Sequence, residues 1–265
     1  MVAKNIPVGL ISNLVSKHQN SVVGLNAHPS PNYFNAYYAV NPFDGGIQYN
    51  KLPNNVDVIL PGLTVVSDPA SKVNNGDWYG ASGAYRQADA DSTSTKIEDD
   101  DAVFTADIVG SIVHWASNAG GSSNKGYGVV TGYDVDTLTI VKCDGVDFAS
   151  SYYYWIKHAG WIVPVTGIYL MTMRWQIVAP EDGMLYINRF LTSTAHAAPV
   201  VQTQVNSVAA STGEFPSIFT LMLLLTKNDE FMASLFQTGT TGVPGIKVGS
   251  AGRSFIFYYL LQQTA

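Results

Sequence analysis

The stretch WIVPVTGIYLMTMRWQI, residues 161–177, and the stretch RSFIFYYLLQ, residues 253–262, decide the fold that the sequence predicts. Both are rich in aromatic and β-branched residues, which favour the pleated surface of a strand. We expect them to form an opening strand and an ending strand that pair with one another. Such a pair predicts a compact all-β unit that closes on its own C-terminus.

Two further strand-like segments lie between these ends, GMLYINRF (183–190) and FTLMLLLTKNDEFMASLF (219–236). The second segment is interpreted as two strands joined by a turn at KNDE (227–230). Asn and Asp suit a turn, because their short side chains bond to their own backbone and tolerate left-handed dihedral angles.

The order and content of these segments resemble the C1q/tumour-necrosis-factor-like jelly roll. PVTGIY (164–169) is similar to its opening strand, Asp229 and Glu230 to its acidic turn, and SFIFYYLL (254–261) to its closing strand. The resemblance covers about residues 155–265. It implies a jelly-roll domain, which we place at residues 159–265, and a homotrimer whose axis is lined by apolar and aromatic strand residues.

Residues 1–75 show no sustained helix or strand period and contain seven of the twelve prolines. Proline removes a backbone donor and interrupts regular elements. The stretch is nevertheless rich in apolar and aromatic residues, as at Tyr33, Phe34, Tyr37 and Tyr38, so its composition is not that of a disordered segment. We interpret it as an extended N-terminal arm that is ordered by docking on a surface. An irregular layer packed on the chain's own domain is the open alternative.

The middle of the chain, residues 76–158, is predicted to be a small antiparallel β-barrel or sandwich module. Residues 76–100 are rich in Gly, Ser, Thr and Asp and are interpreted as a leading linker. Short β-branched and aromatic runs follow, separated by turn residues. The phrases FTADIVG (104–110) and YDVDTLTI (133–140) resemble a small β-module that recurs in tail and spike proteins of bacteriophages. The resemblance covers about residues 98–158 and implies a virion protein.

The composition limits the classes of partner. The chain is 46% apolar and only 13% charged, so we expect some of its surface to be covered by a partner, most simply by further copies of itself. Its net charge of −6 argues against nucleic-acid binding, which depends on clustered Lys and Arg. No window approaches the roughly 18 apolar residues of a membrane span, so we expect no membrane insertion.

A search for catalytic and metal-binding patterns predicts no catalytic, cofactor-binding or metal-binding residue. The single cysteine, Cys143, is interpreted as structural. The histidines have no metal-ligand spacing; they are His18, His28, His114, His158 and His196. Acidic residues gather in one loop, where a solvated polar turn is favoured over a calcium site; they are Asp89, Asp91, Glu98, Asp99, Asp100 and Asp101.

These observations favour a bacteriophage virion structural protein, assembled in the host cytoplasm. The hypothesis is a homotrimeric capsid decoration, or cement, protein that clamps neighbouring major capsid subunits through its N-terminal arm. The alternative is a receptor-binding protein attached to tail or baseplate proteins, which recognises a host-surface glycan. An enzyme is a third class that no motif favours.

Overall fold

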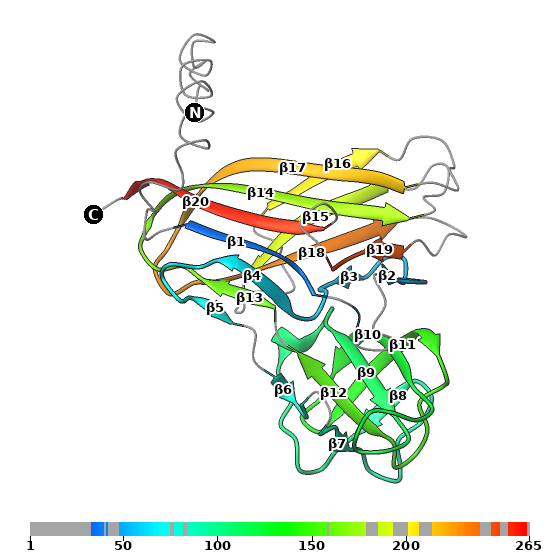
Figure 1. The fold of residues 1–265 in the computed structure, drawn as a ribbon. Coiled ribbons are helices and arrows are strands. Elements are labelled where there is room, and N and C mark those ends of the chain that lie inside the picture. The colour runs from blue at the N-terminus through cyan, green and yellow to red at the C-terminus, as the bar shows by residue number, and fades with distance from the viewer. Residues whose placement is uncertain are drawn as a thin grey trace.

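The computed structural model of the chain describes residues 33–39, 41, 48–74, 77–81, 84–157, 159–178, 185–192, 201–206, 214–238, 245–249 and 254–263. Within these residues the chain is all-β, as the sequence predicts, and the one helical element is a single 3₁₀ turn, η1 (Ala106–Ile108). The strands form three sheets (Figure 1). Two of the sheets build a sandwich, and the third builds a smaller module beside it.

Sheet 1 of the sandwich is centred on the long strand β14. On one side β14 pairs with β17 along its full length, and on the other side it pairs with β20 and β19. Beyond these lie β1, β4 and β2. The bounds are β1 (Tyr33–Tyr38), β2 (Gln48–Tyr49), β4 (Leu63–Ser67), β14 (Gly167–Val178), β17 (Glu214–Leu225), β19 (Gly245–Lys247) and β20 (Phe255–Gln263).

Sheet 2 has the order β16-β15-β18-β13-β5, and β3 also pairs with β18. Its bounds are β3 (Asp57–Val58), β5 (Val73–Asn74), β13 (Gly160–Ile162), β15 (Leu185–Thr192), β16 (Val201–Asn206) and β18 (Glu230–Thr238). From β14 to β20 the chain crosses repeatedly between the two sheets, so that β14 neighbours β17 and β20 while β15 neighbours β16 and β18. This order of antiparallel strands is that of a jelly roll.

Two predictions about the C-terminal half are confirmed. The opening and ending stretches pair, with Leu170 opposite Tyr259, although the opening stretch divides into β13 and β14 around Pro164. The KNDE turn joins β17 to β18, and Asn228 takes the left-handed conformation (φ 71°). Because β17 and β18 belong to different sheets, this turn is a crossing between sheets and not a hairpin.

The described part of the predicted N-terminal arm is not extended over another surface. Residues 33–74 instead contribute β1, β2 and β4 to sheet 1 and β3 and β5 to sheet 2. Strand β1 lies between β20 and β4, and its alternation buries Phe34, Ala36 and Tyr38. The physical reason is that β1 pairs with the far end of the chain, which no local pattern reveals. Residues 1–32 lie outside the described residues.

The sandwich core is aromatic. From Gly167 to Trp175, strand β14 alternates between its two faces and points Tyr169, Met171, Met173 and Trp175 inward. On the inner side of sheet 1, the rings of Tyr38 on β1 and Trp175 on β14 stack at 4.9 Å between centroids. Burying one such side chain stabilises the fold by roughly 1.5–3 kcal/mol, so the core rests on packing and needs no disulfide.

The third sheet has the order β6-β12-β9-β10-β11-β8, and β7 also pairs with β12. Its bounds are β6 (Asp77–Tyr79), β7 (Arg86–Gln87), β8 (Lys96–Glu98), β9 (Ile112–Ala116), β10 (Gly126–Tyr133), β11 (Thr137–Gly145) and β12 (Tyr153–Lys157). Residues 76–100, which we expected as a linker, therefore supply three short strands. Gly80 follows β6 in the left-handed conformation (φ 67°), Ser92 and Ser94 lie in the loop before β8, and side chains such as Ile97 enter the module's own core.

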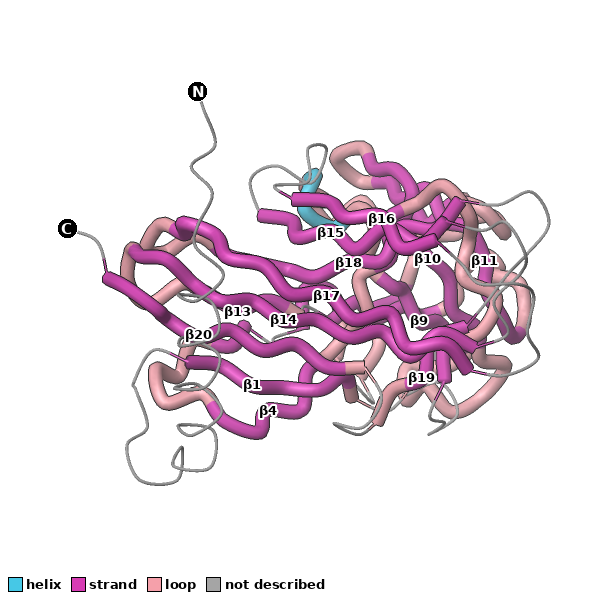
Figure 2. Tube along the Cα trace, turned by 90° about the horizontal axis from the view of Figure 1, so that it is seen from above, coloured by secondary structure: helices cyan, strands magenta, loops and turns pink. Residues whose placement is uncertain are grey.

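The module packs tightly against the sandwich. The backbone of Ile59 exchanges hydrogen bonds with Gly110 (2.8 Å) and Ile112 (3.3 Å). Side chains of the module also belong to the same continuous hydrophobic cluster as the sandwich core, among them Ile112, Tyr127 and Cys143. In Figure 1 the module lies on the side of the sandwich away from β17, and Figure 2 shows it from above, toward the end of the sandwich where β19 lies.

Candidate functional site

The acidic loop of the module is organised by internal bonds. Asp99 is buried and receives two bonds from the Arg86 guanidinium, a bond from the Tyr154 hydroxyl (2.7 Å) and one from the Asp101 amide (3.1 Å). Burial alone would raise the pKa of Asp99, but these bonds outweigh it and lower the pKa. Asp89 accepts a bond from the Asp100 amide (2.7 Å). Asp99 thus ties β7, β12 and the loop after β8 together.

No group of three or more His, Cys, Asp and Glu side chains among the described residues has an arrangement that could hold a metal ion. Two carboxylates of the acidic loop pair with cations, and two others lie close to one another. Glu98 pairs with Lys96, Asp99 pairs with Arg86, and the charge of Asp89 raises the pKa of Asp100. Four of the five histidines, His18, His28, His158 and His196, lie outside the described residues.

His114 is a fully buried side chain between the module and the sandwich. It lies on β9 opposite Tyr127 of β10 and Trp155 of β12, and its ring centre is 5.2 Å from that of Trp155 and 6.1 Å from that of Tyr49. Neither ring nitrogen has a hydrogen-bond partner among the described residues. Burial lowers the pKa of His114 to about 3, so the imidazole is neutral at ordinary pH. It fills space in the core.

Cys143 is also a core residue. It is buried in the cluster that the module shares with the sandwich, where burial, reinforced by the charge of Asp144, raises the pKa of its thiol. A thiol that stays protonated is a poor nucleophile and a poor metal ligand. The structure therefore fits a structural role for this cysteine.

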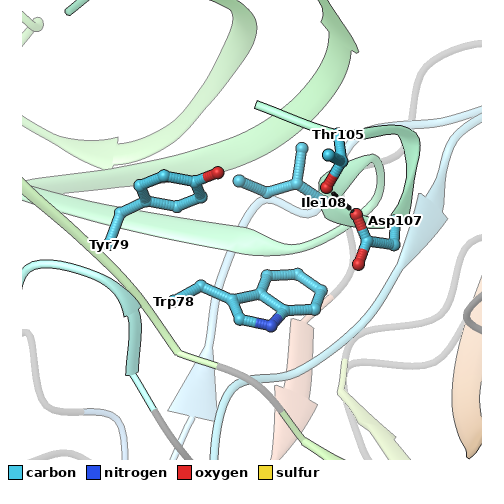
Figure 3. Close-up of a pocket in the computed structure, with 5 residues that line it drawn as sticks. All are labelled: Trp78, Tyr79, Thr105, Asp107 and Ile108. Atoms are coloured by element: carbon cyan, nitrogen blue, oxygen red, sulfur yellow. Dashed lines mark hydrogen bonds between the residues drawn. The ribbon is translucent and has the colours of Figure 1, made fainter. Parts of the chain in front are cut away.

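A small pocket of about 120 Å³ opens on the module beside the sandwich, lined by Trp78, Tyr79, Thr105, Asp107 and Ile108 (Figure 3). Trp78 packs against Ile59 and Met232 of the sandwich. Tyr79 bonds through its hydroxyl to the carbonyl of Val103, which fixes its ring. Thr105 donates to one carboxylate oxygen of the half-buried Asp107. Burial, followed by the charge of Asp107, raises the pKa of Tyr79.

A second notable surface is the outward side of sheet 1, formed by β14, β17 and β20, which we call the outer face. Ile218, Met222 and Leu224 on β17 are 58%, 59% and 66% exposed. Leu170 on β14 lies in register between Met222 and Tyr259 of β20. These three strands carry two charged residues, Arg174 and Glu214. Among the described strands β17 pairs only with β14, so it is an edge strand.

Arg174 lies within the outer face, opposite Ile218 and Phe255. One terminal nitrogen of its guanidinium donates to the side-chain oxygen of Gln176 (2.7 Å). Its buried Nε has no acceptor among the described residues. A cation held on an apolar sheet face without a carboxylate is an incomplete arrangement.

Sequence reasoning missed both surfaces as sites. The pocket joins Trp78 and Tyr79, which fell in the expected linker, to Asp107, and their approach depends on tertiary folding. The outer face had a visible signal, because the run IFTLMLLL (218–225) is apolar at every position but Thr220. A strand with one face in the core and the other in water is expected to alternate between apolar and polar residues. A run that is apolar at nearly every position therefore indicates that the second face is also covered.

The sandwich defines the chain as an all-β protein with a jelly-roll fold. No protein-family model matches the chain, and no curated protein matches its sequence. Among solved structures, the chain is similar to one described as the structure of Eiger TNF from S. frugiperda, at 14% sequence identity and a TM-score of 0.31. The match covers 58% of this chain and 92% of that one. A TM-score of 0.31 is too low for this likeness to bear on assembly or function.

In the part of the chain that the structure describes, no helix has the length and the apolar character that a membrane crossing requires.

Proposed function

We propose that this protein is a non-catalytic structural subunit of a bacteriophage virion, a homotrimeric decoration protein whose copies associate through the outer face. The observation that carries the proposal is the exposed apolar edge strand β17. A long apolar edge strand open to water invites uncontrolled pairing, and natural proteins cover such edges. The bacteriophage assignment rests on the sequence resemblance of residues 98–158.

The energetics favour covering this face with another copy of the chain. Ile218, Met222 and Leu224 together would contribute roughly 3–5 kcal/mol per subunit if an interface buried their exposed portions. A cyclic contact between copies, in which each apolar face meets a neighbouring copy, needs no further partner. A neighbouring copy would also supply an acceptor for the buried Nε of Arg174.

Sedimentation velocity on the purified chain tests the association. We expect a species of about three times the 28.5 kDa chain mass. Met222→Glu should dissociate it, because the new carboxylate would be buried in the contact. The matched control is Val135→Glu, which changes an equally exposed apolar residue (63%) in the module and should leave the trimer intact. A wild-type monomer at micromolar and higher concentrations would refute the self-association.

Attachment to the shell is assigned to residues 1–32, because residues 33–74 supply strands of the sandwich. Deletion of residues 2–32 should leave the trimer intact and abolish binding to particles that lack the protein. Unchanged binding would show that attachment uses another surface.

The alternative is a tail-attached receptor-binding protein that recognises a host-surface glycan, and the placement of the module favours it. The module extends from the sandwich on the side away from β17, where an assembly through the outer face would leave it accessible (Figure 1). Immunogold labelling of intact particles with an antibody against residues 160–265 separates the two functions. Label over the head supports decoration, label at the tail supports the alternative, and unlabelled particles would refute both.

A further inference from the structure

We propose that the pocket lined by Trp78, Tyr79 and Asp107 binds a guanidinium group, as an arginine side chain of a partner protein presents it. This inference is independent of the proposed function, since the pocket belongs to the module and lies away from the outer face. The size of the pocket, the polarity of its walls and the rigidity of those walls all favour this ligand.

The size of the pocket limits the ligand to one small group. A volume of about 120 Å³ is well below the roughly 300–1,000 Å³ of pockets that enclose whole drug-sized ligands. A single side-chain head group or one small ring is therefore the largest group that it can enclose. The rest of the partner would remain outside.

The polar groups of the pocket call for a ligand that donates hydrogen bonds. The Asp107 carboxylate accepts from Thr105 at one oxygen, and no described residue donates to its other oxygen. The Tyr79 hydroxyl donates its hydrogen to the Val103 carbonyl oxygen, so towards a ligand it can only accept a hydrogen bond. Among the residues that the structure describes, no ion pair neutralises Asp107 either. Arg86, whose charge also acts on Tyr79, is held by two bonds to Asp99.

The apolar walls call for a flat cation. Trp78 and Tyr79 approach the pocket from two sides, with Ile108 and the Asp107 carboxylate beyond them (Figure 3). A cation over an indole or phenol ring is attracted by the ring quadrupole. Guanidinium is planar, stacks on aromatic faces and donates to a carboxylate in the same plane. It therefore satisfies both the rings and Asp107, whereas a neutral sugar, whose hydroxyls can also donate to Asp107, carries no positive charge to pair with the carboxylate.

The walls are held in place before any ligand arrives. Trp78 is supported by Ile59 and Met232, and Tyr79 is supported by Phe104 at 4.8 Å between ring centres. Thr105 orients the carboxylate of Asp107. A site whose groups are already positioned loses little conformational entropy on binding, which favours recognition of even a small group.

Methylguanidinium is the probe that tests the proposal. Binding is followed in the full-length protein by the NMR signal of the Trp78 indole NH, which Trp78→Phe identifies. We expect a saturable shift with half-saturation on the order of tens of millimolar, typical of one exposed cation–π contact with one ion pair. Asp107→Asn should weaken binding at least threefold. The control Asp91→Asn removes an exposed carboxylate of the acidic loop that does not line the pocket, and should bind as the wild type.

The same titration with methyl glucoside at constant ionic strength distinguishes a glycan site. Saturation by the glycoside without saturation by methylguanidinium would overturn the choice of ligand. A linear response to both probes, or equal affinity for methylguanidinium in wild type and Asp107→Asn, would overturn the site itself. Both variants change surface side chains, so their folded state is checked by an unchanged spectrum away from the pocket.

Discussion

Acid should destabilise this protein through His114, and the structure sets the size of the effect. The imidazole is fully buried, and burial lowers its pKa to about 3 in the folded chain, against roughly 6.5 in an unfolded one. Below pH 6.5 the imidazole takes up a proton in the unfolded state but stays neutral in the folded state. The free energy of unfolding is therefore at its full value above pH 6.5 and falls as the pH drops towards 3. The slope is about 1.4 kcal/mol per pH unit, which gives roughly 2 kcal/mol between pH 7 and pH 5.

Replacement of His114 by leucine isolates this effect. Leucine fills a similar volume among Tyr49, Tyr127 and Trp155 and cannot titrate. It also removes two buried nitrogens that have no partner among the described residues, so at pH 7 we expect the variant to be at least as stable as the wild type. Urea unfolding of both proteins at pH 7 and pH 5, at one protein concentration, measures the difference.

The expected result is that the wild type loses about 2 kcal/mol more than His114→Leu between pH 7 and pH 5. Carboxylates such as Asp99 contribute equally to both proteins and cancel. Val129→Ala, a cavity-forming change in the same cluster, is the control and should lower stability by the same amount at both pH values. Equal pH dependence in wild type and His114→Leu would refute the reasoning, because it would mean that the folded protein accommodates the imidazolium.

Three further predictions concern the module. Asp99→Asn should lower the free energy of unfolding, measured in urea, by about 2–3 kcal/mol, because it removes the buried partner of the partly exposed Arg86. A decrease below about 1 kcal/mol would contradict a structural role for the pair. Gly126→Ala should lower the free energy of unfolding by about 2–3 kcal/mol, because a Cβ there would collide with the Trp115 indole and lie 2.5 Å from the Val146 carbonyl oxygen. An unchanged melting temperature would show that the strand can shift to make room for the methyl group. The Cys143 thiol should react with an aromatic disulfide reagent only when the chain unfolds, and rapid labelling of native protein would contradict its burial.

The sequence predicted those features of the fold that local patterns determine. The aromatic and β-branched content of residues 161–177 and 253–262 identified the stretches that contain β14 and β20, and their pairing followed from the idea of a closed unit. The turn at residues 227–230 was readable, because Asn at a left-handed position has a local physical cause.

The pairing of strands that lie far apart in the sequence could not be predicted. Strand β1 reads YFNAYY and is separated from its partner β20 by most of the chain, so its proline-rich surroundings indicated an arm and its register had no local signature. The short strands β6 to β8 have two or three residues each, too few to show a period. The pocket could not be predicted for the same reason, because Trp78 and Asp107 come together only when the folded sheet brings β6 close to η1.

The pairing of β5 with β13 makes the module an exchangeable insertion. Asn74, shortly before the module begins, lies opposite Gly160, just after it ends, and Val73 lies opposite Trp161. A tight turn could therefore replace the whole module without shifting the register of any sandwich strand. The remaining cost would be exposure of the side chains that the module now covers, such as Tyr49, whose ring contacts Tyr127 of the module. Substituting a few such residues with polar ones would make the jelly roll a platform on which different modules can be mounted at one fixed position.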